Sequence, residues 1–378
     1  MGKEFLEGNE AIARAAIEAG CDFFAGYPIT PSSTILHYML DHLPHNGGMG
    51  IQAEDEIASM GFCIAAAMAG RKVLTATSGP GISLYSENLG LALIGETPMV
   101  IVNVQRQGPS TGSATKGAEG DIQFTRWVTS GGMPIIALSP ATVEEAYELT
   151  FHAFNMAEQY RTPVFILTSK EIGLTRESVD LGAIKPVTRI DRKKVGKNDK
   201  YIPHYFEKTS EVPLIADFGG EHIARFTGST HDKNAYLTSS PAIIQEMIDH
   251  YTDKINEAVD ELALYKKDIQ PGAEVLIVSY GVMSRSAAVA IRQAREKGYK
   301  VSSLVLQTLF PVPEKVIKSA LQGIKRVIVP EMNMGQYILE IERLTAGQAE
   351  VIGVHKMDTT LISPAKILEK VMLEKGEL

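Results

Sequence analysis

The sequence predicts an α/β protein with two parallel-sheet domains, and three observations support this fold class. Short, continuously apolar segments alternate with segments whose apolar residues recur at helical spacing. This alternation runs through residues 1–180 and resumes over 270–378, which indicates two separate sheets. The length of 378 residues suits two or three domains of roughly 100–200 residues each.

In the first half of the chain, the expected helices and strands follow one another in alternating order. The sequence predicts helices over residues 10–19, 56–69 and 142–159, and another after Pro31 with Ser32 and Ser33 as candidate caps. It predicts strands over residues 22–27, 72–77, 98–104, 134–138 and 163–168. Because these strands are apolar on both faces, we expect a parallel sheet covered by helices on both sides.

A change in composition near residue 185 marks the end of the first domain. Lys185–Lys208 holds eight Lys or Arg and three Asp or Glu, which predicts an exposed linker or lid. A long helix then opens at Ser240-Pro241 and carries apolar residues at helical spacing as far as Leu262.

A second, smaller α/β domain follows that long helix. Its expected strands cover residues 274–279, 300–306 and 326–329, and its expected helices cover residues 284–297 and 314–321. We therefore expect a first domain over residues 1–185, an irregular basic linker with a long helix over 186–267, and a second domain over 268–378.

Composition disfavours several classes of function. The formal net charge of −8 argues against a basic surface for nucleic acid. No apolar stretch approaches the roughly 18 residues of a membrane helix, and the acidic N-terminus does not suggest a secretory signal. Cys21 and Cys63 cannot hold an iron–sulfur cluster alone, and the histidines lack metal-ligand spacing. We expect a cytoplasmic protein with no metal site of its own and no nucleic-acid or membrane partner.

Three loops at expected strand ends are candidates for ligand binding, since ligands of open α/β sheets bind at the carboxyl ends of the strands. They cover residues 26–33, 78–81 and 105–112, and none is a P-loop or a dinucleotide-binding fingerprint. The residues alone leave tight turns and ligand loops equally open. Arg106 in the third loop suits a small carboxylate, which a guanidinium can bind through two parallel hydrogen bonds.

An acidic cluster, Glu54-Asp55-Glu56, precedes a helix rich in small residues over 58–69. Acidic residues at a helix start commonly complement the helix dipole, which is the simpler interpretation. A single carboxylate buried beside a ligand would instead serve in acid–base chemistry.

Taken together, these segments resemble the α subunit of the 2-oxoacid:ferredoxin oxidoreductases. The matching segments, in the family's order, are Y27-P-I-T-P-S-S33, E54-D-E-I-A-S-M-G61, T77-S-G-P-G81, V104-Q-R-Q-G-P-S-T-G112 and V329-P-E-M-N-M-G-Q336. The resemblance covers nearly the whole chain and is weakest over residues 185–240. It implies a thiamine-diphosphate-binding, pyrimidine-type parallel-sheet domain followed by a transketolase C-terminal-like α/β domain. The nearest fit is to the 2-oxoglutarate enzymes in which γ and δ are separate chains.

The resemblance implies oxidative decarboxylation of a 2-oxoacid with coenzyme A to acyl-CoA and CO₂, with reduction of ferredoxin. In such enzymes the α subunit supplies the pyrimidine side of the thiamine diphosphate site, and a β subunit supplies the diphosphate and Mg²⁺ side. This chain lacks the G-D-G…Asn metal signature and a cysteine set for a cluster. We therefore expect Mg²⁺ and [4Fe-4S] clusters in partner subunits, which are a β subunit and, where these are separate chains, γ and a ferredoxin-like δ.

The resemblance also assigns roles to individual residues. Glu56, rather than Glu54, would be catalytic: hydrogen-bonded to N1′ of the aminopyrimidine, it favours the imino tautomer that takes the C2 proton. Arg106 and Thr30 would hold the substrate carboxylate, with Thr111 and Thr115 as weaker contacts. The residues expected around the cofactor are Tyr27, Pro28, Ile29, Ser78, Gly79, Pro80 and Gly81.

Two departures from the family pattern leave the substrate open. Many relatives have a proline in the loop that reads S-T-G-S-A-T over residues 110–115 here, and many have Gln where this chain has Glu119. We expect 2-oxoglutarate, with branched-chain and aryl 2-oxoacids as alternatives and pyruvate less favoured. The remaining alternatives are a non-catalytic assembly subunit and a lipoamide-linked dehydrogenase, whose relatives lack the Y-P-I-T-P loop.

Overall fold

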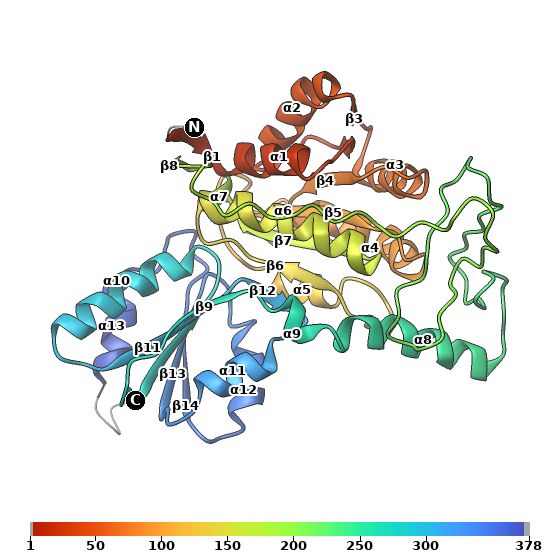
Figure 1. The fold of residues 1–378 in the computed structure, drawn as a ribbon. Helices are drawn as coiled ribbons and strands as arrows, with labels where there is room; N and C mark the ends of the chain where they lie inside the picture. Colours follow the sequence, from red (N-terminus) through yellow and green to blue (C-terminus); the bar gives the residue numbers. More distant parts are fainter. Residues whose placement is uncertain (1–2, 374–378) are drawn as a thin grey trace.

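Two β-sheets organise the protein, as the computed structural model of residues 3–373 shows (Figure 1). The larger sheet has seven strands in the order β12-β6-β7-β5-β4-β2-β3, all parallel except β12. These strands are β2 (Phe23–Gly26), β3 (Met49–Gln52), β4 (Val73–Thr77), β5 (Met99–Gln105), β6 (Ile136–Leu138), β7 (Pro163–Ser169) and β12 (Thr308–Phe310). Residues 1–2 and 374–378, which begin and end the two expected domains, lie outside the described residues.

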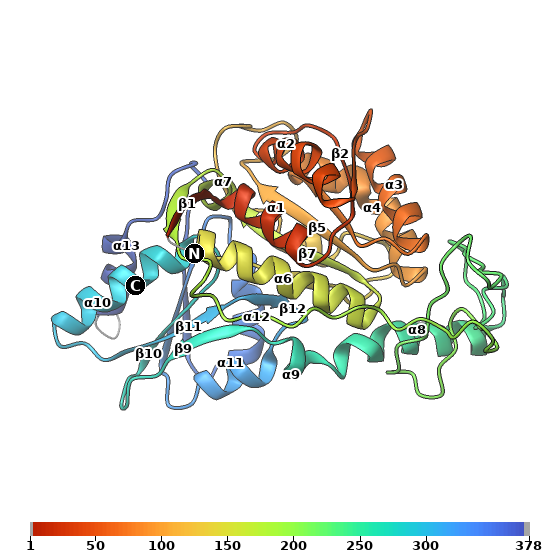
Figure 2. The same cartoon turned by 45° about the horizontal axis from the view of Figure 1, so that its top comes forward.

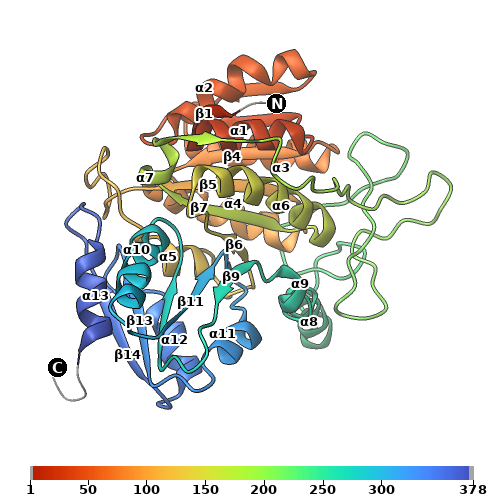
Figure 3. The same cartoon turned by 60° about the vertical axis from the view of Figure 1, so that its left-hand side comes forward.

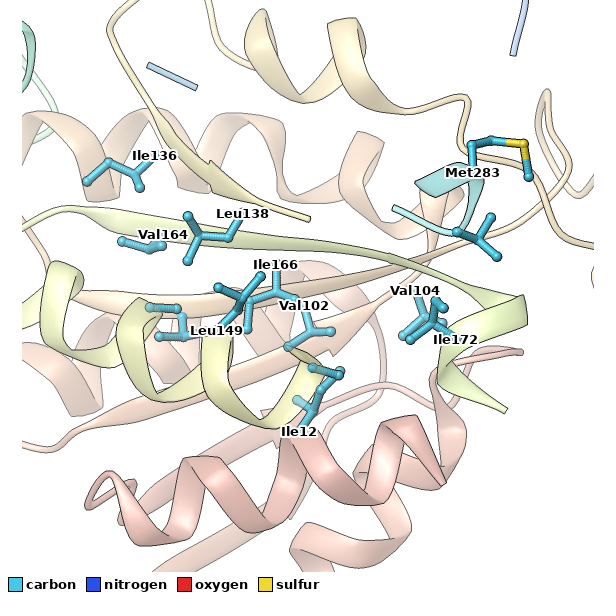
Figure 4. Packing of buried hydrophobic residues seen from close by; sticks show 14 of the residues in the cluster. Ile12, Val102, Val104, Ile136, Leu138, Leu149, Val164, Ile166, Ile172 and Met283 are labelled. Carbon is cyan, nitrogen blue, oxygen red and sulfur yellow. The ribbon is translucent and has the colours of Figure 1, made fainter. Parts of the chain in front are cut away.

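Helices cover both faces of the larger sheet, because the side chains on both faces of its strands are mostly apolar. One face packs on α1 (Gly8–Glu18), α2 (Ser33–His42) and α6 (Val143–Tyr160), and the other on α3 (Glu56–Met68), α4 (Gly79–Ile94) and α5 (Ile122–Arg126). Figure 4 shows Val102 and Ile166 of the sheet close to Ile12 of α1 and Leu149 of α6, which cover the same face. The parallel, doubly covered α/β class expected from the sequence is confirmed.

The smaller sheet has five strands in the order β14-β13-β10-β11-β9, all parallel except β9 (Figure 3). These strands are β9 (Tyr265–Asp268), β10 (Val275–Ser279), β11 (Val301–Leu306), β13 (Arg326–Glu331) and β14 (Glu350–His355). Its helices are α10 (Met283–Glu296), α11 (Glu314–Ala320), α12 (Ile338–Thr345) and α13 (Pro364–Met372). Smaller elements of the first domain are β1 (Glu4–Glu7) paired with β8 (Arg176–Val179), α7 (Lys170–Gly173), and a 3₁₀ turn (Pro44–Asn46).

Several elements differ from the sequence-based expectation. The turn at Ser78–Gly81 is the start of a full helix, α4, which its many glycines and small residues concealed. The long helix expected from Pro241 to Leu262 is two helices, α8 (Pro241–Asn256) and α9 (Val259–Leu262), so that part of the expectation is wrong. The second domain also gives a strand, β12, to the first sheet. No helix within residues 3–373 is long and apolar enough to cross a membrane.

The segment expected to be an exposed linker is anchored to the first sheet's helices. Arg192 is almost fully buried, and its Nε donates to Oε2 of Glu158 on α6 at 2.8 Å. The same guanidinium donates to the carbonyls of Ala67 and Arg71, at the end of α3 and just beyond it. A buried charge is stable only when paired and hydrogen-bonded, so this guanidinium fixes the segment in place. The expectation of an exposed linker is therefore wrong at Arg192.

A buried carboxylate at the end of α4 holds the same segment together with α8. Glu96 accepts hydrogen bonds from His204 Nδ1 (2.7 Å), His250 Nε2 (2.9 Å) and Lys254 Nζ (2.6 Å). Burial alone would raise the pKa of Glu96, but the cations around it, Lys254 foremost, hold that pKa well below its usual value. Burial lowers the pKa of His204 to about 4. In Figures 1 and 2, α8 and the irregular loops extend to one side, and this cluster ties them to the body.

The two domains meet at a buried glutamate. Glu119 is 1% exposed, and its Oε1 accepts a hydrogen bond from the backbone N–H of Val282 at 2.9 Å, just before α10. Its backbone N–H donates to Met332 O, and its carbonyl accepts from the side chain of Asn333. Burial, with the nearby carboxylates Glu171 and Glu331, raises the pKa of Glu119 to about 8.

We expect this glutamate to make the stability of the chain fall as the pH rises. The folded state keeps its proton up to about pH 8, whereas an unfolded glutamate releases it near pH 4.5. Stability is therefore full below about pH 4.5 and declines as the pH rises through 8. Each unit between the two pKa values corresponds to about 1.4 kcal/mol. Glu119→Gln should remove this decline, measured as melting temperature from pH 5 to 9.

The control for this measurement is Glu369→Gln, which removes the charge of an exposed glutamate on α13. That variant should follow the wild-type profile. A Glu119→Gln profile that is parallel to the wild type would show that Glu119 is not the titrating group.

Candidate active site

Three loops meet at one edge of the larger sheet, because β5, β4 and β2 are neighbours and run in parallel. Residues 27–32 follow β2, Ser78 follows β4, and Arg106 follows β5. The start of α3 comes to the same edge with Glu56. The order of the strands, not nearness in sequence, brings these residues together.

The acidic cluster before α3 divides into two roles. Asp55 is the helix cap, since its side chain accepts from the N–H of Ala58 at 2.7 Å. Glu54 is exposed, whereas Glu56 is 6% exposed. Burial raises the pKa of Glu56, against the opposing effects of its own backbone N–H and of Arg106. Glu56 is therefore the buried carboxyl of the three, and its burial raises its pKa.

Arg106 is a buried guanidinium beside Glu56. It is 7% exposed, and its Nη1 donates to the carbonyl of Thr30 at 2.7 Å. Its Nε has no hydrogen-bond partner within residues 3–373. Burial lowers the pKa of Arg106, although Asp121 and Glu56 nearby favour its charged form. One side of the guanidinium is thus fixed to the Thr30 loop, and the Nε side remains available for an anion.

Asp121 is a site residue that the sequence reasoning missed. Its Oδ2 accepts from Asn103 Nδ2 at 3.0 Å, and its backbone N–H donates to Gln105 Oε1 at 3.0 Å. Burial raises its pKa, while Asn103 and Arg106 oppose that rise. The sequence held one sign of a polar partner here: Asn103 and Gln105 are polar residues at alternate positions of an otherwise apolar strand.

Glycines allow the two carboxyls to approach the start of α4. A Cβ at Gly79 would lie 2.9 Å from Oδ2 of Asp121. A Cβ at Gly81 would overlap Oγ1 of Thr77 and lie 2.9 Å from Cγ of Glu56. The Ser78–Gly81 turn therefore lies between the carboxyls of Glu56 and Asp121.

Several buried polar atoms at this edge lack a protein partner. Within the described part of the chain, these atoms are Ser78 Oγ, Asn103 Oδ1, Gln105 Nε2 and Arg106 Nε. Buried polar atoms are nearly always hydrogen-bonded, so the edge is built to receive a polar ligand. A buried carboxyl, a guanidinium and free donors and acceptors suit a heteroaromatic cofactor and a small carboxylate.

Other predicted residues lie at the rim. Tyr27, Pro28 and Thr30 are exposed, and Ile29 is half-buried, so these residues form the outer wall of the edge. Thr111 and Thr115 are exposed and lie on the loop of residues 107–118. No hydrogen bond within residues 3–373 joins Thr111 to Glu56 or Arg106, so its role stays a prediction. The described residues contain no cluster of three His, Cys, Asp or Glu that could hold a metal ion.

Family models match nearly the whole chain. Residues 14–259 match the model described as pyruvate flavodoxin/ferredoxin oxidoreductase, thiamine diphosphate-binding. Residues 273–367 match pyruvate:ferredoxin oxidoreductase core domain II. The chain belongs to the 2-oxoacid:ferredoxin oxidoreductase family. The resemblance drawn from the sequence is confirmed, and the larger sheet is the thiamine-diphosphate-binding domain of this oxidoreductase subunit.

Full-length relatives agree with this assignment. The 2-oxoglutarate synthase subunit KorA of Methanocaldococcus jannaschii is 42% identical over 99% of this chain and 100% of its own length. The ketoisovalerate oxidoreductase subunit VorB of Methanothermobacter thermautotrophicus is 33% identical over 100% of this chain and 99% of its own.

A solved structure has the same fold. It is a 2-oxoglutarate:ferredoxin oxidoreductase from Magnetococcus marinus, described with 2-oxoglutarate, coenzyme A and succinyl-CoA bound. Its chain superposes on 98% of this one with a TM-score of 0.92 and 31% identity. The chain described here covers 65% of the length of that longer chain.

The close approach at Gly81 predicts how this edge responds to a single methyl group. Gly81→Ala should destabilise the chain by about 1–3 kcal/mol, because the added Cβ overlaps Thr77 and displaces Glu56. Thermal unfolding of the purified chain measures this effect.

The matched control is Gly90→Ala on the same helix, where the nearest atom to an added Cβ is 4.0 Å away. There the helix preference of Ala, about 1 kcal/mol over Gly, should leave stability unchanged or raised. Equal effects at the two positions would contradict the packing argument.

Proposed function

We propose that this chain is the α subunit of a 2-oxoglutarate:ferredoxin oxidoreductase. The reaction is oxidative decarboxylation of 2-oxoglutarate with coenzyme A to succinyl-CoA and CO₂, with electrons passed to ferredoxin. The observation that carries the proposal is the buried pair Glu56 and Arg106 at one sheet edge. Full-length similarity to a 2-oxoglutarate synthase subunit supports this substrate.

Glu56 has the properties needed to hold the pyrimidine ring of thiamine diphosphate. When bound, that cofactor supplies the electron sink for decarboxylation. The buried carboxyl of Glu56 would hydrogen-bond N1′ of the ring, and its raised pKa suits a group that shares a proton with a ring nitrogen. The unpartnered Ser78 Oγ and the backbone of Gly79–Gly81 would line the same ring.

Arg106 would bind the carboxylate next to the 2-oxo group. Its Nη1 is held by the Thr30 carbonyl, which fixes the guanidinium plane, and its Nε side is available for the substrate. An oriented guanidinium loses little freedom on binding and favours a planar carboxylate. Thr30 lies close enough to offer its hydroxyl at the rim. We assign the far carboxylate of 2-oxoglutarate to a partner subunit.

The exposed apolar residues beside Glu56 support a β subunit docked on α3 and α4. Ile57 is 52% exposed, Phe62 is 42% exposed and Leu84 is 46% exposed. A partner that covered these side chains would also exclude water from Glu56 and raise the strength of its hydrogen bond to the ring. The proposed β subunit supplies the diphosphate and Mg²⁺ half of the site.

The electron-transfer clusters of the proposed enzyme belong to partner subunits. Cys21 and Cys63 are buried, and burial raises the pKa of each thiol, so neither offers a thiolate at the surface. We assign the [4Fe-4S] clusters to the β subunit and to a ferredoxin-like δ subunit, with γ as a further partner. Ferredoxin is the external acceptor.

The test is an anaerobic assay of the co-expressed complex across a panel of 2-oxoacids, with viologen as acceptor. We expect coenzyme-A-dependent reduction with 2-oxoglutarate and much slower reduction with pyruvate. Preference for a branched-chain 2-oxoacid would fit the similarity to the ketoisovalerate subunit and would replace the substrate assignment. A complex with cofactor and clusters but no turnover would contradict the proposal.

Substitution of Glu56 separates catalysis from folding. Glu56→Gln in the assembled complex should lower kcat by at least about 100-fold, because the amide cannot share a proton with N1′. The melting temperature should change little, since glutamine has the same size. Glu54→Gln is the matched control, two residues away and exposed, and should keep near-normal turnover. Near-normal turnover of Glu56→Gln would rule out the assigned role.

A further inference from the structure

The loop of residues 107–118 follows Arg106, and after it the chain comes back to β5 at Asp121. Residues 109–113 and 115–116 of this loop are exposed, and it pairs mainly with itself, through Gln107 with Ser113 and Lys116. At its far end, Asp121 is tied to Asn103 and Gln105 of β5, directly before Arg106. The position of the returning segment is therefore linked to the position of Arg106.

Among the described residues, the second domain holds this returning segment, residues 119–123, with six hydrogen bonds. Gln336 carries three of them: its Oε1 accepts from Gln123 N (2.9 Å), its Nε2 donates to Gly120 O (2.6 Å), and its carbonyl accepts from Gln123 Nε2 (3.1 Å). The other three join Glu119 to Val282, Met332 and Asn333. Gly120 and Gln123 lie on either side of Asp121, so one side chain fixes the backbone on both sides of it.

The turn that carries Gln336 is itself rigid. Glu331 is fully buried at the end of β13, and its carboxylate accepts from Tyr280 Oη (2.7 Å), Tyr337 N (2.8 Å) and Ile338 N (3.1 Å). The Oδ1 of Asn333 accepts from the N–H of Gln336 at 3.1 Å. These bonds anchor the turn between β13 and α12, so Gln336 is held before it reaches the first domain.

We propose that Gln336 is a positioning residue for substrate binding: it clamps Gly120 and Gln123 and so sets where Arg106 meets the substrate carboxylate. The clamp itself consists of hydrogen bonds within this chain. Its effect on the 2-oxoacid rests on the proposed function. Gln336 lies in the second domain and acts through Asp121 and β5. The second domain thereby takes part in recognition of the 2-oxoacid.

Proteolysis of the purified chain tests the clamp without any enzyme activity. Trypsin can cut after Lys116 only when the loop opens, because Gly117 is buried and the Lys116 carbonyl accepts from Gln107 N. Loss of two side-chain hydrogen bonds in Gln336→Ala should speed this cut about tenfold. Gln336→Met, which keeps the side-chain volume, should give the same increase and replaces the Ala variant if that one fails to fold.

The matched control is Met334→Ala, an 82% exposed side chain in the same turn, which should cut at the wild-type rate. Mass spectrometry of the fragment ending at residue 116 separates this cut from those at other lysines. An unchanged rate in both Gln336 variants would overturn the clamp.

Kinetics of the assembled complex test the effect on the substrate. We expect the Gln336 variants to raise KM for the 2-oxoacid about five- to tenfold, with kcat within about twofold, because a misplaced Arg106 weakens binding but leaves Glu56 in place. A fall in kcat with unchanged KM would overturn the positioning role. If the wild-type complex turned over no 2-oxoacid, the proposed function would fail, whereas the cleavage rates would still decide the clamp.

Discussion

Parallel pairing of β2, β4 and β5 is the constraint on which the candidate site depends. Parallel neighbours end at the same edge, so three loops and the start of α3 lie together although they are far apart in the sequence. The pairing also requires strands that are apolar on both faces, which leaves only their ends for polar side chains. Asn103 and Gln105 near the end of β5 are where that polar chemistry begins.

The sequence predicted the fold class and most of the central strands because short, continuously apolar runs between helical segments are typical of strands buried on both faces. It failed where local signals were weak or opposed. Small residues and glycines concealed α4, although those glycines are what lets Glu56 and Asp121 approach its start. The short strands β3 and β12 carry little periodicity, and only pairing with distant neighbours defines them.

The candidate site was predicted in part for the same reason. Motif resemblance named Glu56 and Arg106, and the structure brings both to one edge with perturbed pKa values. Asp121 and Gln336 were missed because their importance comes from hydrogen bonds across 16 to 216 positions in sequence. Three histidines that are scattered in the sequence gather at Glu96. His204 and His250 bond to its carboxylate, and His231 packs against His204. No spacing rule in a single sequence reveals such contacts.

The buried carboxylate of Glu96 depends on residues that are made later than Glu96 itself. Its counter-charges, Arg161 and Lys254, come 65 and 158 positions later, and the antiparallel edge strand of the same sheet comes only at Thr308–Phe310. When only the first 185 residues have been made, Glu96 has Arg161 but lacks Lys254, and the sheet has an edge that β12 does not yet cover. The first domain is therefore complete in its charges and in its sheet only after most of the chain has been made.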